Sequence, residues 1–227
     1  MPDDYYQNIL YPLQDKVLHV VANLPVEFYL TGGTALSRAY FHHRYSDDLD
    51  FFVNHALDFK QQVNFTVASV RDEGIEIEAA LVDEDFARFL IKDSNALLKL
   101  DFVNDVPYRF GTNISTSLFT RTDNLQNILI NKITALNRGE AKDVVDLVFI
   151  CKNLSFNWQD IIEEAARKDA WVNAVNLATT LEQFHPERFH EIMWIDAPPT
   201  DEWFKTHLHI LISELLYGQD NSLSSKF

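Results

Sequence analysis

Apolar and polar residues alternate in short runs through the first half of the chain, a pattern typical of strands separated by turns and helices. Helices are predicted at residues 14–23, 35–43 and 58–73; Thr34 is the expected N-cap of the second, and Gly74 ends the third. The turn Asp93-Ser94-Asn95 is predicted to join the last two long strands. The predicted strands are 26–30, 48–53, 75–82, 86–92, 96–103 and a further short one at 117–120.

From Asp123 onward the apolar residues recur at helical spacing instead. Leu125, Ile128, Leu129 and Leu136 follow an i, i+3, i+4 pattern, and further helices are predicted at 141–152, 158–168, 170–184 and 201–217. We therefore predict an α+β protein. It would have a mixed α/β core over residues 1–121, with a sheet and flanking helices, and a helical C-terminal region over residues 122–227 packed on that core.

Composition narrows the class of protein. With 47% apolar residues, 23% charged residues and 6 glycines, the chain is typical of a globular protein. No run approaches 18 apolar residues, which argues against a membrane span, and the single cysteine, Cys151, fits a reducing cytoplasm. The formal net charge is -15 and both halves are acidic, so tight nonspecific binding to DNA or RNA is not expected. An excess of acidic residues is also compatible with a site that binds divalent cations, although a negative surface more often keeps a protein soluble.

Acidic residues interrupt two otherwise apolar strands. Alternation in the first places Asp48 and Asp50 on one face, where like charges repel unless a cation or a proton lies between them. In the second strand, Lys99 and Asp101 share a face in the same way. If the two strands pair, three carboxylates converge. Hard divalent ions such as Mg²⁺ take oxygen ligands, and two such ions support phosphoryl or nucleotidyl transfer.

A glycine turn precedes the first acidic strand. Thr31-Gly32-Gly33-Thr34 lies at the start of a predicted helix, whose unpaired backbone N–H groups and positive dipole end favour a phosphate. The phosphate site and the carboxylates would then face each other.

At these residues the sequence resembles the nucleotidyltransferase superfamily typified by DNA polymerase β, whose signature is Gly-Gly or Gly-Ser, then Asp-x-Asp or Asp-x-Glu, and a later Asp. More narrowly, it is similar to the AbiEii/AbiGii toxin family of bacterial abortive-infection and toxin–antitoxin systems. That similarity rests on residues 30–36 and 44–52 and on a helical segment with Lys132, Ala135, Leu136, Arg138, Lys142, Asp143, Asp146 and Leu147.

The resemblance implies a nucleotidyltransferase-like mixed sheet and the metal-dependent transfer of a nucleotide from an NTP. In that case the triphosphate is held by Gly32, Gly33 and Thr34. The metals, two Mg²⁺ ions, are bound by the catalytic acids Asp48, Asp50 and Asp101. Lys132 with Asp143 or Asp146 completes the nucleotide site.

Other residues near the motifs leave alternatives open. Lys132 either extends to solvent from the apolar side of its helix or binds phosphate. Asp143 is either a first-turn helix acid or a site residue, whereas Asp146 needs a partner among Lys132, Lys142 and Arg138. Arg44, which we group with Ser46 as a candidate nucleotide ligand, is either a site residue or a plain surface arginine. Lys99 is either a substrate ligand or part of a structural ion pair.

The leading hypothesis is a Mg²⁺-dependent nucleotidyltransferase that acts as a toxin or phage-defence enzyme, held in check by an antitoxin protein. The acceptor is an RNA, such as a tRNA end, or a protein. The acidic balance predicts that an RNA acceptor is met over a small footprint near Arg38, Arg44, Lys99, Lys132, Arg138 and Lys142. The alternatives are a nucleotide-binding or regulatory protein without transfer activity on the same fold, and an interaction protein whose C-terminal tryptophans bind a partner.

Overall fold

The computed structural model describes residues 2–93 and 95–224, and the chain forms two compact units. The first unit ends at Asn124 and the second begins at Leu125. The predicted turn Asp93-Ser94-Asn95 includes Ser94, which lies outside the described residues.

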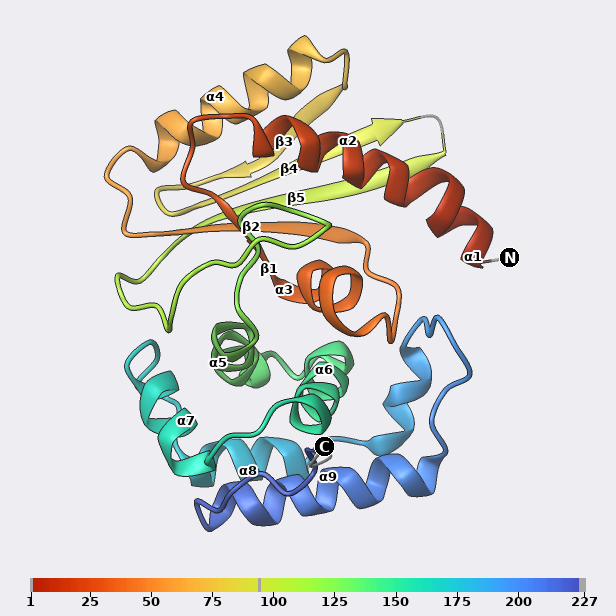
Figure 1. Cartoon of the computed structure of the whole chain (residues 1–227), viewed down its shortest axis with the longest axis vertical. Coiled ribbons are helices and arrows are strands. Elements are labelled where there is room, and N and C mark those ends of the chain that lie inside the picture. The colour runs from red at the N-terminus through yellow and green to blue at the C-terminus, as the bar shows by residue number, and fades with distance from the viewer. Residues whose placement is uncertain (1, 94, 225–227) are drawn as a thin grey trace. The chain divides into compact units, whose positions relative to one another are not determined.

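A mixed sheet forms the centre of the first unit (Figure 1). Within the described residues it has five strands in the order β1-β2-β5-β4-β3. β2 runs parallel to β5, and the other neighbouring pairs are antiparallel. The strand bounds are β1 Tyr29–Thr31, β2 Asp48–Asn54, β3 Ile77–Val82, β4 Phe86–Asp93 and β5 Ala96–Asp105.

The short strand predicted at 117–120 is wrong. That segment is a turn, and the chain makes only isolated bridges there, from Ile114 to Thr122 and from Thr122 to Leu30. The apolar residue that suggested a strand, Phe119, is buried against Phe51 of β2 rather than paired in a ladder.

Helices of the first unit lie before and between the strands. Figure 1 shows α2 and α4 on the same side of the sheet, and they contact each other. The N-terminal helical run begins at Pro2, well before the predicted start at residue 14, because Tyr6, Leu10 and Tyr11 supply its buried side. The bounds are α1 Pro2–Tyr5, the π-helical η1 Tyr6–Leu10, α2 Tyr11–Ala22, α3 Gly32–Thr34, the π-helical η2 Ala35–Phe41 and α4 Phe59–Asp72.

One face of the sheet is apolar and packed. Phe51 of β2 and Phe102 of β5 are fully buried and stack with ring centroids 5.6 Å apart, and Phe28 packs on Phe102 from the segment before β1. Each such buried side chain contributes roughly 1.5–3 kcal/mol. This face anchors β2 and β5 side by side, and strand alternation then leaves Asp48, Asp50 and Asp101 for the opposite face.

The second unit is helical. Side chains of Asn157, Asn173 and Thr200 cap the N-termini of α7, α8 and α9, which explains where these helices begin. Trp158, Phe189 and Phe204 are fully buried in its core, so Trp158 is a packing residue rather than part of a partner surface. The bounds are α5 Leu125–Ala135, η3 Leu136–Arg138, α6 Ala141–Asn153, α7 Trp158–Ala166, α8 Ala174–Glu182, η4 Pro186–Glu191 and α9 Asp201–Leu216.

In the part of the chain that the structure describes, every helix is too short or too polar to cross a bilayer.

Candidate functional site

Three carboxylates share the face of the sheet opposite the apolar one, as the alternation predicted. The parallel register of β2 and β5 pairs Asp50 with Asp101 and Asp48 with Lys99. The same cross-strand row continues to Thr31 on one side and to Arg88 on the other. We call Asp48, Asp50, Asp101, Lys99 and Arg88 the acidic face; its net formal charge is -1, three acids against two bases.

Two cations on the acidic face hold two of its acids. Lys99 Nζ lies 2.6 Å from Oδ2 of Asp48, so Lys99 forms an ion pair, which was one of its two predicted roles. Arg88 Nε donates to Oδ1 of Asp101 at 2.8 Å, and Nη2 donates to Oδ2 at 2.7 Å. The hydrogen bond to Asp101, and then the negative charges of Asp101, Asp48 and Asp50, raise the pKa of Arg88.

This pairing changes the expected metal geometry. Within residues 2–93 and 95–224, no group of three or more His, Cys, Asp or Glu side chains is arranged to hold a metal ion. The prediction that the three carboxylates lie within bridging reach of one another is therefore not met, because Asp48 and Asp101 are turned to their cations. The donors still fit Mg²⁺ in kind, since all three are hard carboxylate oxygens on one face.

The Gly32-Gly33 turn packs directly against the acidic face. Gly32 has φ +69°, and a Cβ at that position would lie 2.1 Å from Oδ2 of Asp50. A Cβ at Gly33 would lie 2.5 Å from Nη2 of Arg44 and 3.0 Å from Oγ of Ser46. Gly32 is therefore required by its positive φ and by Asp50, whereas a side chain at Gly33 would displace the Arg44 guanidinium.

Thr34 does not cap the helix as predicted. It has helical backbone angles, the N-cap position belongs to Thr31, and the Thr34 hydroxyl donates to the backbone oxygen of Asp48. Thr34 therefore ties the glycine turn to the start of β2, which fixes the distance between the turn and the acidic strand.

Arg44 and Ser46 are buried behind the glycine turn. Arg44 is 5% exposed and Ser46 is 6% exposed, so the interpretation of Arg44 as a plain surface residue is wrong. Arg44 Nη1 donates to the backbone oxygen of Tyr45 at 2.9 Å, and Gln14 Nε2 donates to that of Ser46 at 3.0 Å. The segment leading into β2 is thus held by α2, and the Arg44 guanidinium lies against Gly33 of the turn.

Two residues of this region, Arg88 and Asp123, were not predicted from the sequence as site residues. Arg88 lies in a predicted strand, and the register of the predicted hairpin between that strand and the next was the available signal that places it beside Asp101. Asp123 is fully buried, accepts a hydrogen bond from Thr31 Oγ1 at 2.7 Å, and pairs with Arg109 at 2.7 Å. A carboxylate at the predicted boundary between sheet and helices was the available signal for Asp123.

In the second unit, Lys132, Asp143 and Asp146 form a buried cluster. Lys132 Nζ lies 2.8 Å from Oδ1 of Asp143 and 2.6 Å from Oδ2 of Asp146, and Arg138 reaches Asp143 at 3.0 Å. The Lys132 side chain is 8% exposed, so the interpretation that it extends to solvent is wrong. Lys132 is the partner that Asp146 needed, and Asp143 is more than a first-turn helix acid. We call Lys132, Asp143 and Asp146 the buried cluster.

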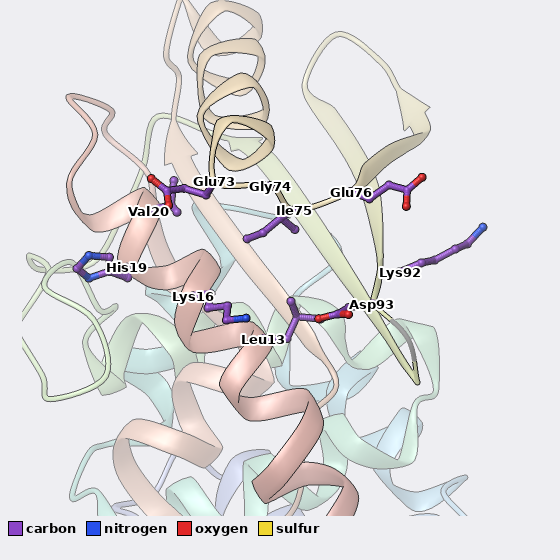
Figure 2. A pocket seen from close by; sticks show the side chains of 10 residues that line it. All are labelled: Leu13, Lys16, His19, Val20, Glu73, Gly74, Ile75, Glu76, Lys92 and Asp93. Atoms are coloured by element: carbon purple, nitrogen blue, oxygen red, sulfur yellow. The ribbon is translucent and has the colours of Figure 1, made fainter.

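A pocket of about 520 Å³ lies elsewhere in the first unit (Figure 2). It is lined by α2, the turn after α4 and the end of β4, where Lys16, His19, Glu73, Glu76 and Lys92 mix both signs of charge. None of the predicted site residues lines this pocket.

The model of the family described as nucleotidyl transferase AbiEii toxin, type IV toxin–antitoxin system, matches residues 19–205. The chain belongs to this family. All the predicted site residues of this AbiEii chain, from Gly32 to Asp146, lie within the matched region.

Two solved structures share the fold of this AbiEii chain. JHP933 from Helicobacter pylori is 20% identical, with a TM-score of 0.58 over 92% of this chain and 90% of that one. The "putative nucleotidyltransferase from H. pylori" is also 20% identical, with a TM-score of 0.57 over 91% and 93%. No curated protein matches the chain. The structural likeness confirms the predicted mixed α/β class, and the family supports a nucleotidyltransferase role in a toxin–antitoxin system.

Proposed function

We propose that the acidic face and the Gly32-Gly33 turn form the donor site of a Mg²⁺-dependent nucleotidyltransferase that uses an NTP. The observation that supports this most is the packing of the turn on the acids. A side chain would not fit at Gly32, because Asp50 occupies that space. The turn and the carboxylate are thus in contact, so a triphosphate bound at the turn would lie next to the acids.

In the proposed reaction, a hydroxyl oxygen of the acceptor forms a bond to the α-phosphorus of the NTP. The bond from that phosphorus to the β-phosphate bridging oxygen breaks, pyrophosphate leaves, and the hydroxyl proton passes to a carboxylate of the acidic face. Asp48 and Asp50 would hold the divalent ion, which would supply charge neutralisation for the phosphates. The glycine turn would orient the triphosphate through its backbone N–H groups.

The acceptor that we propose is an RNA end met over a small footprint. The net charge of -15 argues against a long contact with a nucleic-acid backbone, since each neutralised phosphate needs a basic partner. Binding of transfer RNA at two salt concentrations tests this. A slope of a few phosphates supports the small footprint, a slope of eight or more contradicts it, and no binding at low salt leaves a protein acceptor.

The experiment for the activity is incubation with each of the four α-³²P-labelled NTPs, Mg²⁺, total RNA and total protein, followed by gel separation. Asp48→Asn and Asp50→Asn should both abolish labelling, whereas Glu84→Gln, which removes one acid from an exposed turn of the same unit, should not. Equal labelling by Asp50→Asn and the unchanged protein would overturn the proposal.

One observation favours a second candidate, a nucleotide-binding protein without transfer activity. Arg88 and Lys99 already neutralise two of the three acids without any metal. Two measurements separate the candidates. A binding protein would show NTP binding in calorimetry but would release no pyrophosphate, whereas a transferase would release pyrophosphate.

A further inference from the structure

Arg88 engages both oxygens of Asp101 in a two-pronged contact. The donor distances are 2.8 and 2.7 Å, and the strand register places the two residues directly opposite each other. Lys99, by contrast, contacts a single oxygen of Asp48 through a flexible side chain. The Arg88–Asp101 contact is therefore more rigid than the Lys99–Asp48 contact. Both carboxylate oxygens of Asp101 bind its cation, whereas only one oxygen of Asp48 does.

The exposure of the pair shows which partner faces the solvent. The Asp101 side chain is 10% exposed and that of Arg88 is 39% exposed. The Phe86 ring lies under the guanidinium, 5.4 Å from its centre, and supports it from the same strand. A guanidinium has five N–H groups and Asp101 takes two of them, so a partly exposed Arg88 keeps further N–H groups that can donate to a ligand.

A guanidinium on both oxygens of a carboxylate makes that carboxylate a poor ligand for a second cation. Like charges in close proximity repel, whereas a phosphate oxygen would be attracted to the same guanidinium. The row Asp50, Asp101, Arg88 thus places an anion-binding group two strands from the Asp48–Asp50 pair.

We propose that Arg88 is a phosphate ligand for the NTP, and that Asp101 is a positioning residue that holds the Arg88 guanidinium rather than a ligand of the divalent ion. This inference rests on the proposed function and deepens it. It leaves Asp48 and Asp50 as the acids that hold the divalent ion.

Two affinities test the inference. The first is that of Mn²⁺ without nucleotide, measured by electron paramagnetic resonance, and the second is that of each Mg²⁺–NTP, measured by calorimetry. Arg88→Ala should weaken nucleotide binding at least tenfold without weakening Mn²⁺ binding. Arg88→Lys keeps the positive charge but loses the planar, two-pronged donor group. Its nucleotide affinity should lie between that of Arg88→Ala and that of the unchanged protein. Lys92→Ala, which removes an exposed charge from the same strand, is the control and should match the unchanged protein.

The double variant Arg88→Ala with Asp101→Asn separates the roles of Asp101, because it removes one charge of each sign. If Asp101 acts through Arg88, the double variant should bind nucleotide no more weakly than Arg88→Ala alone and should keep Mn²⁺ affinity within about threefold. A loss of Mn²⁺ affinity of tenfold or more would show that Asp101 is a metal ligand and would overturn the inference.

The outcomes also separate the inference from the proposed function. A protein that binds NTP equally well with and without Arg88 overturns the inference alone. A protein that binds none of the four NTPs with Mg²⁺ overturns the proposed function and the inference together. Melting temperatures of all variants show whether a lost affinity reflects unfolding, and Arg88→Lys remains informative if Arg88→Ala does not fold.

Discussion

The acidic face of the first unit and the buried cluster of the second combine carboxylates with basic side chains, but most groups of the acidic face are more exposed to water. On the acidic face the side chains of Arg88, Lys99 and Asp48 are 39%, 29% and 24% exposed. In the buried cluster Lys132 is 8% exposed, and its two acids are 1% and 0% exposed. Partly exposed ion pairs contribute little to stability and leave a charged group within reach of a ligand, whereas breaking a buried pair leaves a charge in the core. The same residue types thus favour ligand binding in one region and fold stability in the other.

The largest expected effect tests the first side of this comparison. Asp50→Asn should reduce nucleotide transfer by roughly a thousandfold or more, because it removes a metal-ligating charge at the reacting centre. The melting temperature should be unchanged or slightly higher, since the substitution relieves repulsion between neighbouring acids. Transfer rates and melting curves on the same preparation check this. A variant that loses activity only because it unfolds would place Asp50 with the structural acids.

The second prediction tests the buried cluster. Lys132→Met should lower the free energy of unfolding by about 3–5 kcal/mol, because Asp146 then loses this ion pair in the core and Asp143 keeps only its pair with the exposed Arg138. Lys142→Met, on the exposed side of α6, should change it by less than about 0.5 kcal/mol. Urea unfolding measures both.

Nucleotide affinity of the same Lys132→Met protein, measured below its unfolding transition, sharpens the comparison. An affinity that is unchanged assigns Lys132 to stability alone. A tenfold weaker affinity supports the role in the nucleotide site that the family resemblance implies, in addition to its structural one.

The third prediction uses two glycines of the first unit that share a left-handed backbone. Gly32 and Gly74 have φ +69° and +76°, so alanine costs each about 1 kcal/mol of backbone strain. Only at Gly32 does the new methyl group meet a site residue, Asp50; nothing lies within 4 Å at Gly74. Gly32→Ala should therefore destabilise the unit by about 1–3 kcal/mol more than Gly74→Ala.

Metal affinity distinguishes strain from displacement in that pair. Displacement of Asp50 should weaken Mn²⁺ binding in Gly32→Ala but not in Gly74→Ala. Equal affinities in the two variants would contradict the close packing of the turn on the acidic face.

Local patterns were enough to predict most elements and the shared face of Asp48, Asp50 and Asp101. Strand alternation is a property of neighbouring residues, and it holds whichever strand lies alongside. The cations that hold these acids depend on register instead: Arg88 meets Asp101 across a 13-residue separation. The same limit explains Lys132, whose two acids lie on the next helix, and Asp123, which Thr31 contacts across 92 residues.

Errors at the glycine turn have a local cause. Thr34 has the residue type of an N-cap, but the helix begins at Gly32, three residues before the predicted start, and Thr31 takes the N-cap position. The Thr34 hydroxyl is then used on the Asp48 backbone. Propensity identified the right segment and the wrong residue within it.

The smallest expected effect concerns alkaline pH in the first unit. Burial, and then the negative charge of Asp123, raise the pKa of Tyr40 to about 12. An unfolded tyrosine titrates near pH 10, so the stabilising contribution of the neutral phenol is complete below about pH 10 and is lost as the pH rises toward 12. Tyr40→Phe removes the hydrogen bond to the Asp123 backbone oxygen and should lower the free energy of unfolding by about 1 kcal/mol at pH 8. The phenylalanine does not titrate, so this deficit should narrow between pH 10 and pH 11. Urea unfolding of both proteins at pH 8, 10 and 11 measures it, and a deficit that stays constant over this range would show that Tyr40 titrates in the folded protein as it does in the unfolded chain.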